Sequence, residues 1–280
     1  MNFDPNQIYE IDAQTGIKYL HDASVELILT SPPYALRRAR QYGGIPEQDY
    51  PDWMVSILDS VKPKLTKQAS VLIVIRSHLL HGQVSDYVLK TRLAIRQDGW
   101  FEPDELIWHK GVAPPVGRID RPRHTWEHIL WYTQSKKPYC DVKAGGKPSA
   151  RIGALGRYRT GTARVTDVIR TNTIGARGVD HPAVFPLSLA QQLVQTFSPV
   201  DGLVLDPFVG SGTTCIAASL TGRHYIGFDY KETYVKLARN RVRNSLVKEL
   251  GMEILHDVEM MGCPVEIPDL LPYDDDVELL

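Results

Sequence analysis

Short hydrophobic runs rich in β-branched residues alternate, along most of the chain, with segments in which apolar positions recur every three or four residues. The first pattern is typical of buried parallel strands and the second of amphipathic helices. Strands are expected at residues 8–11, 25–30, 69–75, 202–205 and 224–228, and helices at residues 51–65, 85–96, 186–197, 213–220 and 232–250. Two further runs, 106–109 and 128–132, are expected to form a hairpin at one edge of the sheet. The alternation predicts an α/β fold built on a doubly wound, mostly parallel sheet.

Residues 136–177 break this pattern, because they are rich in Gly, Arg, Lys and Thr and show little helical or strand periodicity. We expect an inserted, loop-rich element here. A length of 280 residues fits one large α/β domain with an insertion, or two small domains. The composition, with 43% hydrophobic and 23% charged residues, excludes disorder throughout, a collagen-like chain and a coiled coil.

Charge is unevenly distributed, although the whole chain carries a net charge of only -1. Residues 110–177 contain 14 Lys and Arg against four acidic residues, whereas the last thirty residues contain nine acidic residues and neither Lys nor Arg. A basic block of this size is expected of a protein that binds a polyanion, because each neutralised phosphate releases counterions. A solvated basic face is the alternative at this point. The acidic end is expected to be a solvating terminus.

Several classes of protein and site are excluded by what the sequence lacks. The cysteines, Cys140, Cys215 and Cys263, form neither a Cys-x-x-Cys pair nor a Cys/His cluster of zinc-ligand spacing, so we expect no metal site. Scattered cysteines in odd number favour a reducing, cytoplasmic compartment. Neither a signal peptide nor an apolar run of about 18 residues is present, so we expect no membrane partner.

A glycine loop, Asp206-Pro-Phe-Val-Gly-Ser-Gly-Thr-Thr214, lies between an expected strand and an expected helix, where a ligand can approach the backbone. It is not a Walker A loop, because no Lys-Ser/Thr pair follows the glycines, and Cys215 replaces the third glycine of a dinucleotide fingerprint. The Asp206 carboxylate would repel a pyrophosphate but suits a cation, such as the sulfonium and amino groups of S-adenosylmethionine. Asp229, nineteen positions after Gly210, has the spacing of an acid that binds ribose hydroxyls. A tight turn with two surface acids is the alternative.

The proline turn Ser31-Pro-Pro-Tyr34 follows another expected strand, and its two prolines stiffen the backbone. In methyl transfer to an exocyclic amine, the obstacle is a nitrogen lone pair delocalised into the ring. The Ser31 hydroxyl and the carbonyl of Pro32 or Pro33 are suited to accept the N–H bonds of such an amine and to aim its lone pair. The ring of Tyr34 offers a face on which a flipped base stacks. A strand-terminating turn with a packed tyrosine is the alternative.

Together these motifs resemble those of the amino-group DNA methyltransferases that depend on S-adenosyl-L-methionine. Residues 30–34 resemble their catalytic motif, 206–214 their cofactor motif, and 222–229 the strand and acid that follow it. The segment His181-Pro-Ala-Val-Phe-Pro186 is similar to their motif at the methionine end of the cofactor, and Asp12 matches the position at the adenine end. The order, with the catalytic motif first and a basic region between the two motifs, resembles the β class. The resemblance implies a Rossmann-like methyltransferase fold.

The resemblance also implies roles for individual residues. The implied catalytic residues are Ser31, Pro32, Pro33 and Tyr34. The implied cofactor-binding residues are Asp12, His181, Phe185, Asp206, Pro207, Phe208, Gly210, Ser211, Gly212, Thr213, Thr214 and Asp229. In this family Ser-Pro-Pro-Tyr is found mostly in enzymes that methylate N4 of cytosine, whereas Asp or Asn replaces the serine in most N6-adenine enzymes. We therefore expect a sequence-specific cytosine-N4 methyltransferase, with N6-adenine methylation and a non-catalytic DNA-binding protein as the alternatives.

Double-stranded DNA is the partner that the resemblance implies. Arginines after the proline turn and at the start of the basic block are expected to bind its phosphates: Arg37, Arg38, Arg40, Arg118, Arg121 and Arg123. Residues between Lys136 and Arg177 are expected to read base edges. The chain would then comprise a catalytic half (1–135), a target-recognition insertion (136–178), a cofactor-binding half (179–250) and an acidic tail (251–280). The sequence leaves open a homodimer and a cognate restriction endonuclease acting on the same site.

Overall fold

The computed structural model describes residues 3–35, 44–111, 120–152, 158–171 and 185–260. The chain divides into two compact units, residues 1–242 and 243–280. The last helix, α7 (Glu232–Met260), begins in the first unit and ends in the second. Residues 251–260, expected as the start of an acidic tail, are therefore helical, while residues 261–280 lie outside the described residues.

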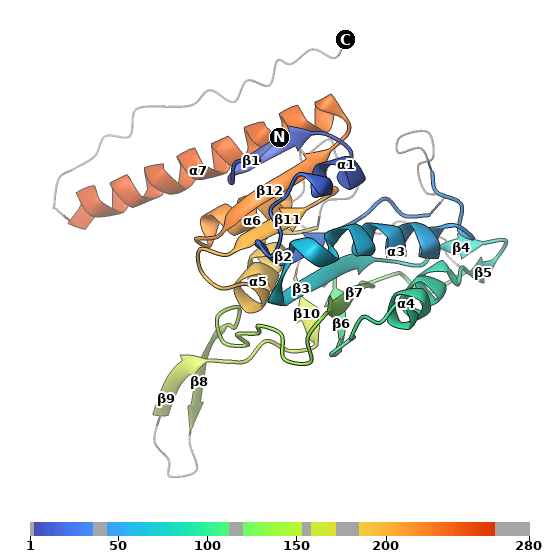
Figure 1. The fold of residues 1–280 in the computed structure, drawn as a ribbon. Helices are drawn as coiled ribbons and strands as arrows, with labels where there is room; N and C mark the ends of the chain where they lie inside the picture. Colours follow the sequence, from blue (N-terminus) through green and yellow to red (C-terminus); the bar gives the residue numbers. More distant parts are fainter. Residues whose placement is uncertain (1–2, 36–43, 112–119, 153–157, 172–184, 261–280) are drawn as a thin grey trace. The chain divides into compact units, whose positions relative to one another are not determined.

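An eight-stranded sheet forms the centre of the first unit, with the strand order β1-β12-β11-β2-β3-β7-β6-β10 (Figure 1). Its strands are β1 (Gln7–Glu10), β2 (Val25–Thr30), β3 (Leu65–Ile75), β6 (Glu105–His109), β7 (Trp126–Thr133), β10 (Val168–Arg170), β11 (Leu203–Asp206) and β12 (His224–Asp229). Neighbouring strands in this sheet are parallel except where β7 pairs with β3 and with β6. The expected doubly wound, mostly parallel sheet is confirmed, and the fold is Rossmann-like.

The expected hairpin of residues 106–109 and 128–132 is present as the antiparallel pair β6–β7, but it does not lie at an edge of the sheet. β7 also pairs with β3, and β6 pairs in parallel with β10, which is the edge strand. The predicted edge position is wrong because β10 has only three residues, too few for a strand period to be recognised in the sequence.

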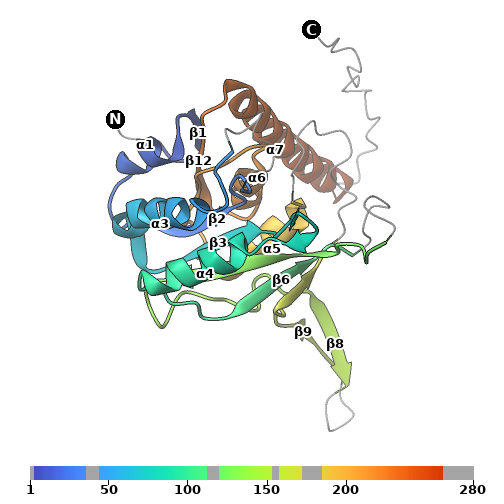
Figure 2. The same cartoon turned by 90° about the vertical axis from the view of Figure 1, so that its right-hand side faces the viewer.

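Helices cover both faces of the sheet (Figures 1 and 2). One face carries α1 (Ala13–Lys18), α3 (Tyr50–Val61), followed by the 3-10 turn η1 (Lys62–Lys64), and α4 (Tyr87–Gln97); the other carries α5 (Leu187–Phe197) and α6 (Thr213–Leu220). In α3 the buried positions Met54, Ile57, Leu58 and Val61 recur every three or four residues, so one stripe of the helix packs into the core. Burying each such side chain contributes roughly 1.5–3 kcal/mol.

The segment 136–177 contains more regular structure than its sequence predicts. β8 (Pro148–Ile152) and β9 (Tyr158–Thr162) pair as an antiparallel ribbon that projects away from the sheet in both views (Figures 1 and 2). The Ala163 N–H donates to the Lys147 carbonyl at 2.9 Å and closes the base of the ribbon. A ribbon outside the core needs no continuous apolar face, so it leaves no alternating pattern in the sequence. A second short pair, β4 (Leu79–Leu80) and β5 (Gln83–Val84), lies outside the main sheet.

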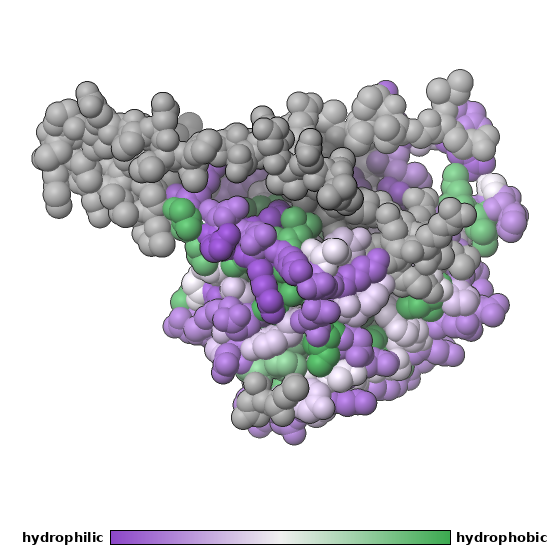
Figure 3. Space-filling model, turned by 90° about the horizontal axis from the view of Figure 1, so that it is seen from above, coloured by the Kyte–Doolittle hydropathy of each residue, from purple (hydrophilic) through white to green (hydrophobic). Residues whose placement is uncertain are grey.

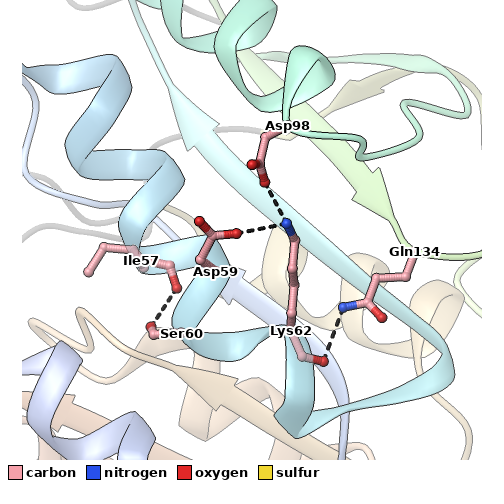
Figure 4. A network of polar contacts seen from close by, with 6 residues as sticks. All are labelled: Ile57, Asp59, Ser60, Lys62, Asp98 and Gln134. Carbon is pink, nitrogen blue, oxygen red and sulfur yellow. Dashed lines mark hydrogen bonds and ion pairs between the residues drawn. The ribbon is translucent and has the colours of Figure 1, made fainter.

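Charged side chains join the ends of several elements at the edge where the parallel strands begin (Figure 4). Lys62 Nζ contacts Asp59 Oδ1 at 2.7 Å and Asp98 Oδ2 at 2.5 Å, which links the end of α3 to the end of α4. Gln134, just after β7, donates to the Lys62 carbonyl at 3.0 Å. The Lys62 ammonium holds the pKa of Asp98 below its ordinary value. These contacts fix helix positions on the side of the sheet away from the strand carboxyl ends.

Among the residues coloured by hydropathy in Figure 3, hydrophilic side chains predominate. Where residues are described on this face, hydrophobic ones form small, separate patches between hydrophilic side chains. Among all the residues that the structure describes, no helix has the length and apolar content needed to span a membrane.

Candidate active site

The carboxyl ends of four adjacent parallel strands meet at one edge of the sheet, because β1, β12, β11 and β2 are neighbours that run in the same direction. Ser31 follows β2, and Asp12 lies two residues after β1. Asp206 and Asp229 are the last residues of β11 and β12. Ligands of open α/β sheets bind outside this kind of edge. The fold therefore gathers four positions that are far apart in the sequence.

The end of β2, which leads into the proline turn, is directly connected to the glycine loop. The Thr30 hydroxyl donates to Asp206 Oδ1 at 2.7 Å, and the Thr214 hydroxyl donates to the Leu29 carbonyl at 3.2 Å. Thr30, Asp206 and Thr214 are all buried, so water does not compete for these bonds. The two motifs therefore lie next to each other, at the ends of the neighbouring strands β2 and β11.

Asp206 is a buried acid with a shifted proton affinity. It is 3% exposed, and burial raises its pKa to about 6, with the charge of Asp229 acting in the same direction. Hydrogen bonds from the Thr214 and Thr30 hydroxyls and from the Phe208 N–H, 3.1 Å from Oδ1, oppose this rise because they stabilise the carboxylate. At neutral pH the group is an anion in a low-dielectric site, which favours a cationic neighbour.

The glycine loop turns tightly into α6. Gly212 precedes the helix in the left-handed conformation (φ 82°), and a Cβ there would lie 3.0 Å from the Cβ of Ala238. Arg241 of α7 donates to the Ser211 carbonyl and holds the loop from the other side. Phe208 is half-buried, 5.5 Å between ring centroids from Trp53 of α3. The other predicted loop residues are buried: Asp206, Pro207, Gly210, Ser211, Gly212, Thr213 and Thr214.

Asp229 ties the glycine loop to the neighbouring strand. Its Oδ2 accepts the N–H of Gly210 at 3.1 Å, and its Oδ1 accepts the N–H of Lys231 at 3.0 Å. Burial raises the pKa of Asp229, and the two backbone N–H groups oppose that rise. Both acids of the motif are therefore buried, and the alternative of two surface acids on a plain turn is wrong.

Asp12 is an exposed helix cap. Its Oδ1 accepts the N–H of Thr15 at 3.0 Å at the start of α1. Partial burial raises the pKa of Asp12, but the hydrogen bonds from Thr15 outweigh it, so the pKa lies below its ordinary value. The position at the end of β1 is the expected one, and capping is a structural role that the sequence analysis did not assign.

The sequence analysis missed Glu127, which contacts the proline turn, and Lys110, which contacts Glu127. The Tyr34 hydroxyl donates to Glu127 Oε2 at 2.8 Å, and Lys110 Nζ lies 2.5 Å from Glu127 Oε1. Glu127 is 6% exposed, and Lys110 also lies 4.8 Å from the centroid of the Trp108 ring. Burial, followed by the charge of Glu127, raises the pKa of Tyr34 well above its ordinary value, so Tyr34 is a neutral donor. An acidic residue inside the buried run of β7 was the signal for such a partner.

The remaining predicted site residues divide into two groups. Arg37, Arg38, Arg40, Arg118 and His181 lie outside the described residues. Phe185 is buried next to the start of α5. Arg121 and Arg123 are exposed in the segment that leads to β7, where Arg121 donates to the Gly82 carbonyl at 3.1 Å. Within the described ranges, no group of His, Cys, Asp and Glu is arranged to hold a metal ion.

Known proteins share both the sequence pattern and the fold of this chain. The family model described as DNA methylase (N6_N4_Mtase) matches residues 25–240. The Type II methyltransferase M.XycI of Xanthomonas campestris pv. cyanopsidis is 27% identical over 273 residues, which cover 84% of this chain and 87% of that protein. The Type II methyltransferase M.PvuII of Proteus hauseri is 23% identical over 307 residues, covering 94% and 91%.

Solved structures give the same result. The PvuII DNA methyltransferase (cytosine-N4-specific) superposes with a TM-score of 0.70 at 20% identity, covering 87% of this chain and 92% of that one. The protein TTHA0409 from Thermus thermophilus, complexed with S-adenosyl-L-methionine, has a TM-score of 0.60 at 26% identity, covering 85% and 93%. The family match spans well over half of the chain and includes both motifs. This chain therefore belongs to the DNA methylase family.

Proposed function

We propose that this protein is a site-specific DNA methyltransferase that transfers a methyl group to the exocyclic N4 amine of cytosine in double-stranded DNA. Family membership supports DNA methylation, and the choice of the cytosine N4 amine is the proposal. The observation that carries the proposal is the 2.7 Å hydrogen bond between Thr30 and Asp206, which joins the proline turn to the glycine loop. An amine held at the turn then lies beside a methyl donor held at the loop.

S-adenosyl-L-methionine is the cofactor, and the residues at this edge fit it. Asp206 is a buried anion suited to the sulfonium and amino groups, and Asp229 stands one strand further along for the ribose hydroxyls. Gly212 adopts the left-handed conformation that turns the loop into α6, and a Cβ there would press against Ala238 of α7. When bound, the cofactor supplies an electrophilic methyl group on a cationic sulfur. Asp12 belongs to the adenine end of this site, and His181 and Phe185 to the methionine end.

The proline turn orients the amine. The Ser31 hydroxyl and the carbonyl of Pro32 or Pro33 accept its N–H bonds, so that the lone pair turns out of the ring. Burial and the charge of Glu127 raise the pKa of Tyr34, and Ser31 opposes that rise, so Ser31 and Tyr34 interact within the turn.

Glu127 and Lys110 position Tyr34. The Tyr34 proton is directed to Glu127, and Lys110 neutralises that carboxylate from the other side. Charge-assisted hydrogen bonds of this kind are stronger and more directional than neutral ones. The ring of Tyr34 is thereby held in one place as the face on which the flipped base stacks.

Ser31 supports cytosine as the target base, since Ser-Pro-Pro-Tyr is the form usual in N4-cytosine enzymes of the family that this chain resembles. The relative M.PvuII has a solved structure described as cytosine-N4-specific, which agrees with this choice. N6-adenine methylation is the alternative from the same chemistry. A non-catalytic DNA-binding protein is the alternative from another class.

Target recognition is proposed for the insertion at residues 136–178, and within it for the β8–β9 ribbon. The major groove of DNA admits a two-stranded ribbon. Arg151 and Arg159 are directly opposite in the ribbon register. Arginine is suited to reading guanine in the major groove, so this register pair is proposed to read base edges.

The proposal is tested by methylating DNA and measuring the modified nucleosides by mass spectrometry. The purified protein is incubated with unmethylated genomic DNA and labelled S-adenosyl-L-methionine, and the DNA is digested to nucleosides. N4-methylcytosine is the expected product. N6-methyladenine would overturn the choice of base, and no methylated nucleoside with a correctly folded, cofactor-bound protein would overturn catalysis. Ser31→Ala serves as the inactive control on the same DNA.

A further inference from the structure

A polar cavity of about 820 Å³ lies between α5 and the ends of β6 and β10. Its lining comes from four separate parts of the chain: His109 and Gly111; Gly145 and Lys147; Arg170 and Thr171; and Ser188, Gln191, Gln192 and Gln195. Of these ten residues none is acidic, and apart from the two glycines all carry polar side chains. Lys147 and Arg170 are exposed, so their charges are available to a ligand. The lining suits an anion with many hydrogen-bond acceptors.

This cavity opens at the same edge of the sheet as the proline turn. β6 runs in the same direction as β3 and β2, because β6 and β3 are both antiparallel to β7, and β10 is parallel to β6. His109 and Arg170 therefore end their strands at the edge where Ser31 follows β2. α5 leads into the start of β11, so its first turn, with Ser188, faces the same edge.

One short segment separates the cavity from the tyrosine of the proline turn. His109 and Gly111 line the cavity, while Lys110 between them reaches Glu127, the partner of Tyr34. The Gly111 N–H donates to His109 Nδ1 at 3.1 Å, which fixes the course of the segment. A chain bound in the cavity would thus pass next to the place where the flipped base is expected.

The wall that carries Lys147 is tightly joined to α5. A Cβ at Gly145 would lie 2.2 Å from the Thr196 Oγ1 and 2.4 Å from the Gln192 carbonyl, so only glycine permits this approach. The Asp141 N–H donates to the Thr196 carbonyl at 2.8 Å. The cavity is therefore a preformed feature of the fold.

We infer that this cavity, the basic groove, binds the sugar-phosphate backbone of duplex DNA beside the target base. The inference rests on the proposed function and names the surface that the duplex occupies. Lys147 directly precedes β8, so a duplex that takes the β8–β9 ribbon into its major groove carries its phosphates past the basic groove. This continuity with the ribbon favours a long polyanion over a small anionic ligand. Lys147 and Arg170 contact phosphates, and the glutamines of α5 donate hydrogen bonds to phosphate and sugar oxygens.

The test removes the two cations and measures DNA affinity as a function of salt. The double variant Lys147→Gln/Arg170→Gln keeps polar side chains but loses two phosphate contacts. We expect duplex binding, measured by fluorescence anisotropy, to weaken roughly 60-fold in 0.1 M salt, and the slope of log affinity against log salt to fall by about 1.8. Affinity for S-adenosyl-L-methionine, measured by calorimetry, is expected to stay unchanged, which shows that the fold and the cofactor site are intact.

The matched control is Lys18→Gln/Lys67→Gln. It removes two exposed cations, one from α1 and one from the beginning of β3, which lies at the edge of the sheet away from the groove. This variant is expected to bind DNA with nearly the affinity and salt slope of the wild type. A second groove variant, Gln191→Glu/Gln195→Glu, adds two negative charges to α5 and is expected to weaken duplex binding at least as much as loss of the cations. If the groove variants bind duplex DNA as the control does, the inference is overturned. The inference is also overturned if the groove variants keep duplex binding but lose binding of a single-stranded RNA of the same sequence, because the groove would then bind a single strand and not duplex DNA.

The readout separates this inference from the proposed function. DNA affinity is measured without catalysis, so a wild-type protein that binds duplex DNA through the groove but forms no methylated nucleoside would contradict only the proposed function. A wild-type protein that methylates DNA while its groove variants keep full affinity would contradict only the basic groove.

Discussion

The glycine-loop corner and the basic groove open at the same edge of one sheet, yet they use polar residues in opposite ways. In the corner, Thr30, Asp206 and Asp229 are buried and their hydrogen bonds are made to other protein groups. In the groove, Lys147 and Arg170 are exposed. Both regions are preformed, but the polar groups of the corner are already paired within the protein, whereas the charges of the groove remain hydrated until a polyanion displaces their counterions.

The difference predicts two kinds of mutational effect. A lost hydrogen bond in a buried, low-dielectric site leaves its partner unsatisfied and costs more than the bond itself contributed. Exposed charges are screened over about 10 Å in 0.1 M salt, so their effects depend on ionic strength. Variants in the corner should therefore have large effects, some of them sensitive to pH, while variants in the groove and the ribbon should have smaller effects that are sensitive to salt or to DNA sequence.

The largest effect is expected at the proline turn. Ser31→Ala removes an acceptor for the amine, and loss of one preorganised hydrogen-bonding group at a reacting centre costs about 100- to 1,000-fold in rate. The rate of methylation is measured in a single turnover at saturating cofactor and DNA. Ser24→Ala, just before the start of β2, is the matched control and should keep the wild-type rate. A loss of less than about five-fold in Ser31→Ala would show that the hydroxyl does not orient the amine.

The next largest effect is expected at Asp206, where pH should act through one buried carboxyl. Burial raises the pKa of Asp206 to about 6, so the anion that attracts a cationic cofactor is lost below that pH. Cofactor affinity, measured by calorimetry, should fall by up to ten-fold for each pH unit below 6. Asp206→Asn should bind the cofactor roughly 30-fold more weakly than the wild type at pH 8, the effect of about 2 kcal/mol, and should show no such decline. A wild-type affinity that does not change between pH 5 and pH 8 would contradict the assignment.

The same pKa shift fixes the pH dependence of stability. The folded protein holds the Asp206 proton up to about pH 6, while an ordinary aspartate releases it near 3.8. Proton binding by Asp206 therefore stabilises the folded state. This stabilisation is fully present below about pH 3.8 and is lost as the pH rises through 6. Between pH 4 and pH 7 the free energy of unfolding of the wild type should fall by about 2 kcal/mol relative to Asp206→Asn. Urea unfolding at a series of pH values measures it, and parallel curves for the two proteins would show that the acid is not buried in solution.

The two regions also differ in how much of them could be predicted from the sequence. The glycine loop and the proline turn were predictable because each is a short, local motif at the end of a strongly hydrophobic strand. Their meeting through Thr30 and Asp206 followed from the rule that parallel strand ends share an edge. The groove was not predictable, because its residues come from four distant segments and its existence depends on the pairing of the three-residue strand β10 with β6. The contact of Tyr34 with Glu127 depends in the same way on which strand lies beyond β3.

A smaller effect, on sequence discrimination, is expected in the ribbon. If Arg151 and Arg159 read base edges, Arg151→Ala/Arg159→Ala should reduce the preference for the cognate site over a mismatched site by about ten-fold or more, since a good base contact contributes roughly 1–3 kcal/mol. Methylation of a library of duplexes, read by sequencing, measures the preference. The groove variant Lys147→Gln/Arg170→Gln is the control, because phosphate contacts weaken all sequences alike. Equal relaxation of specificity in both variants would remove the distinction between ribbon and groove.

The smallest effect tests whether the buried network extends from the corner to the neighbouring strands. Tyr34→Phe removes the hydroxyl bonded to Glu127, and Glu127→Gln removes the charge that Lys110 balances. Each change should lower the methylation rate about five- to ten-fold at unchanged KM for DNA, because the tyrosine ring is held less firmly while the binding surface is intact. In a double-mutant cycle the losses should fall short of additivity by about 1 kcal/mol, the signature of a direct interaction. Tyr132→Phe is the matched control, since the Tyr132 hydroxyl is buried on the same strand β7 and has no hydrogen-bond partner among the described residues. Strictly additive losses, or an equal loss in Tyr132→Phe, would mean that Glu127 stabilises β7 and does not position Tyr34. The functional hydrogen-bond network would then not extend beyond the proline turn.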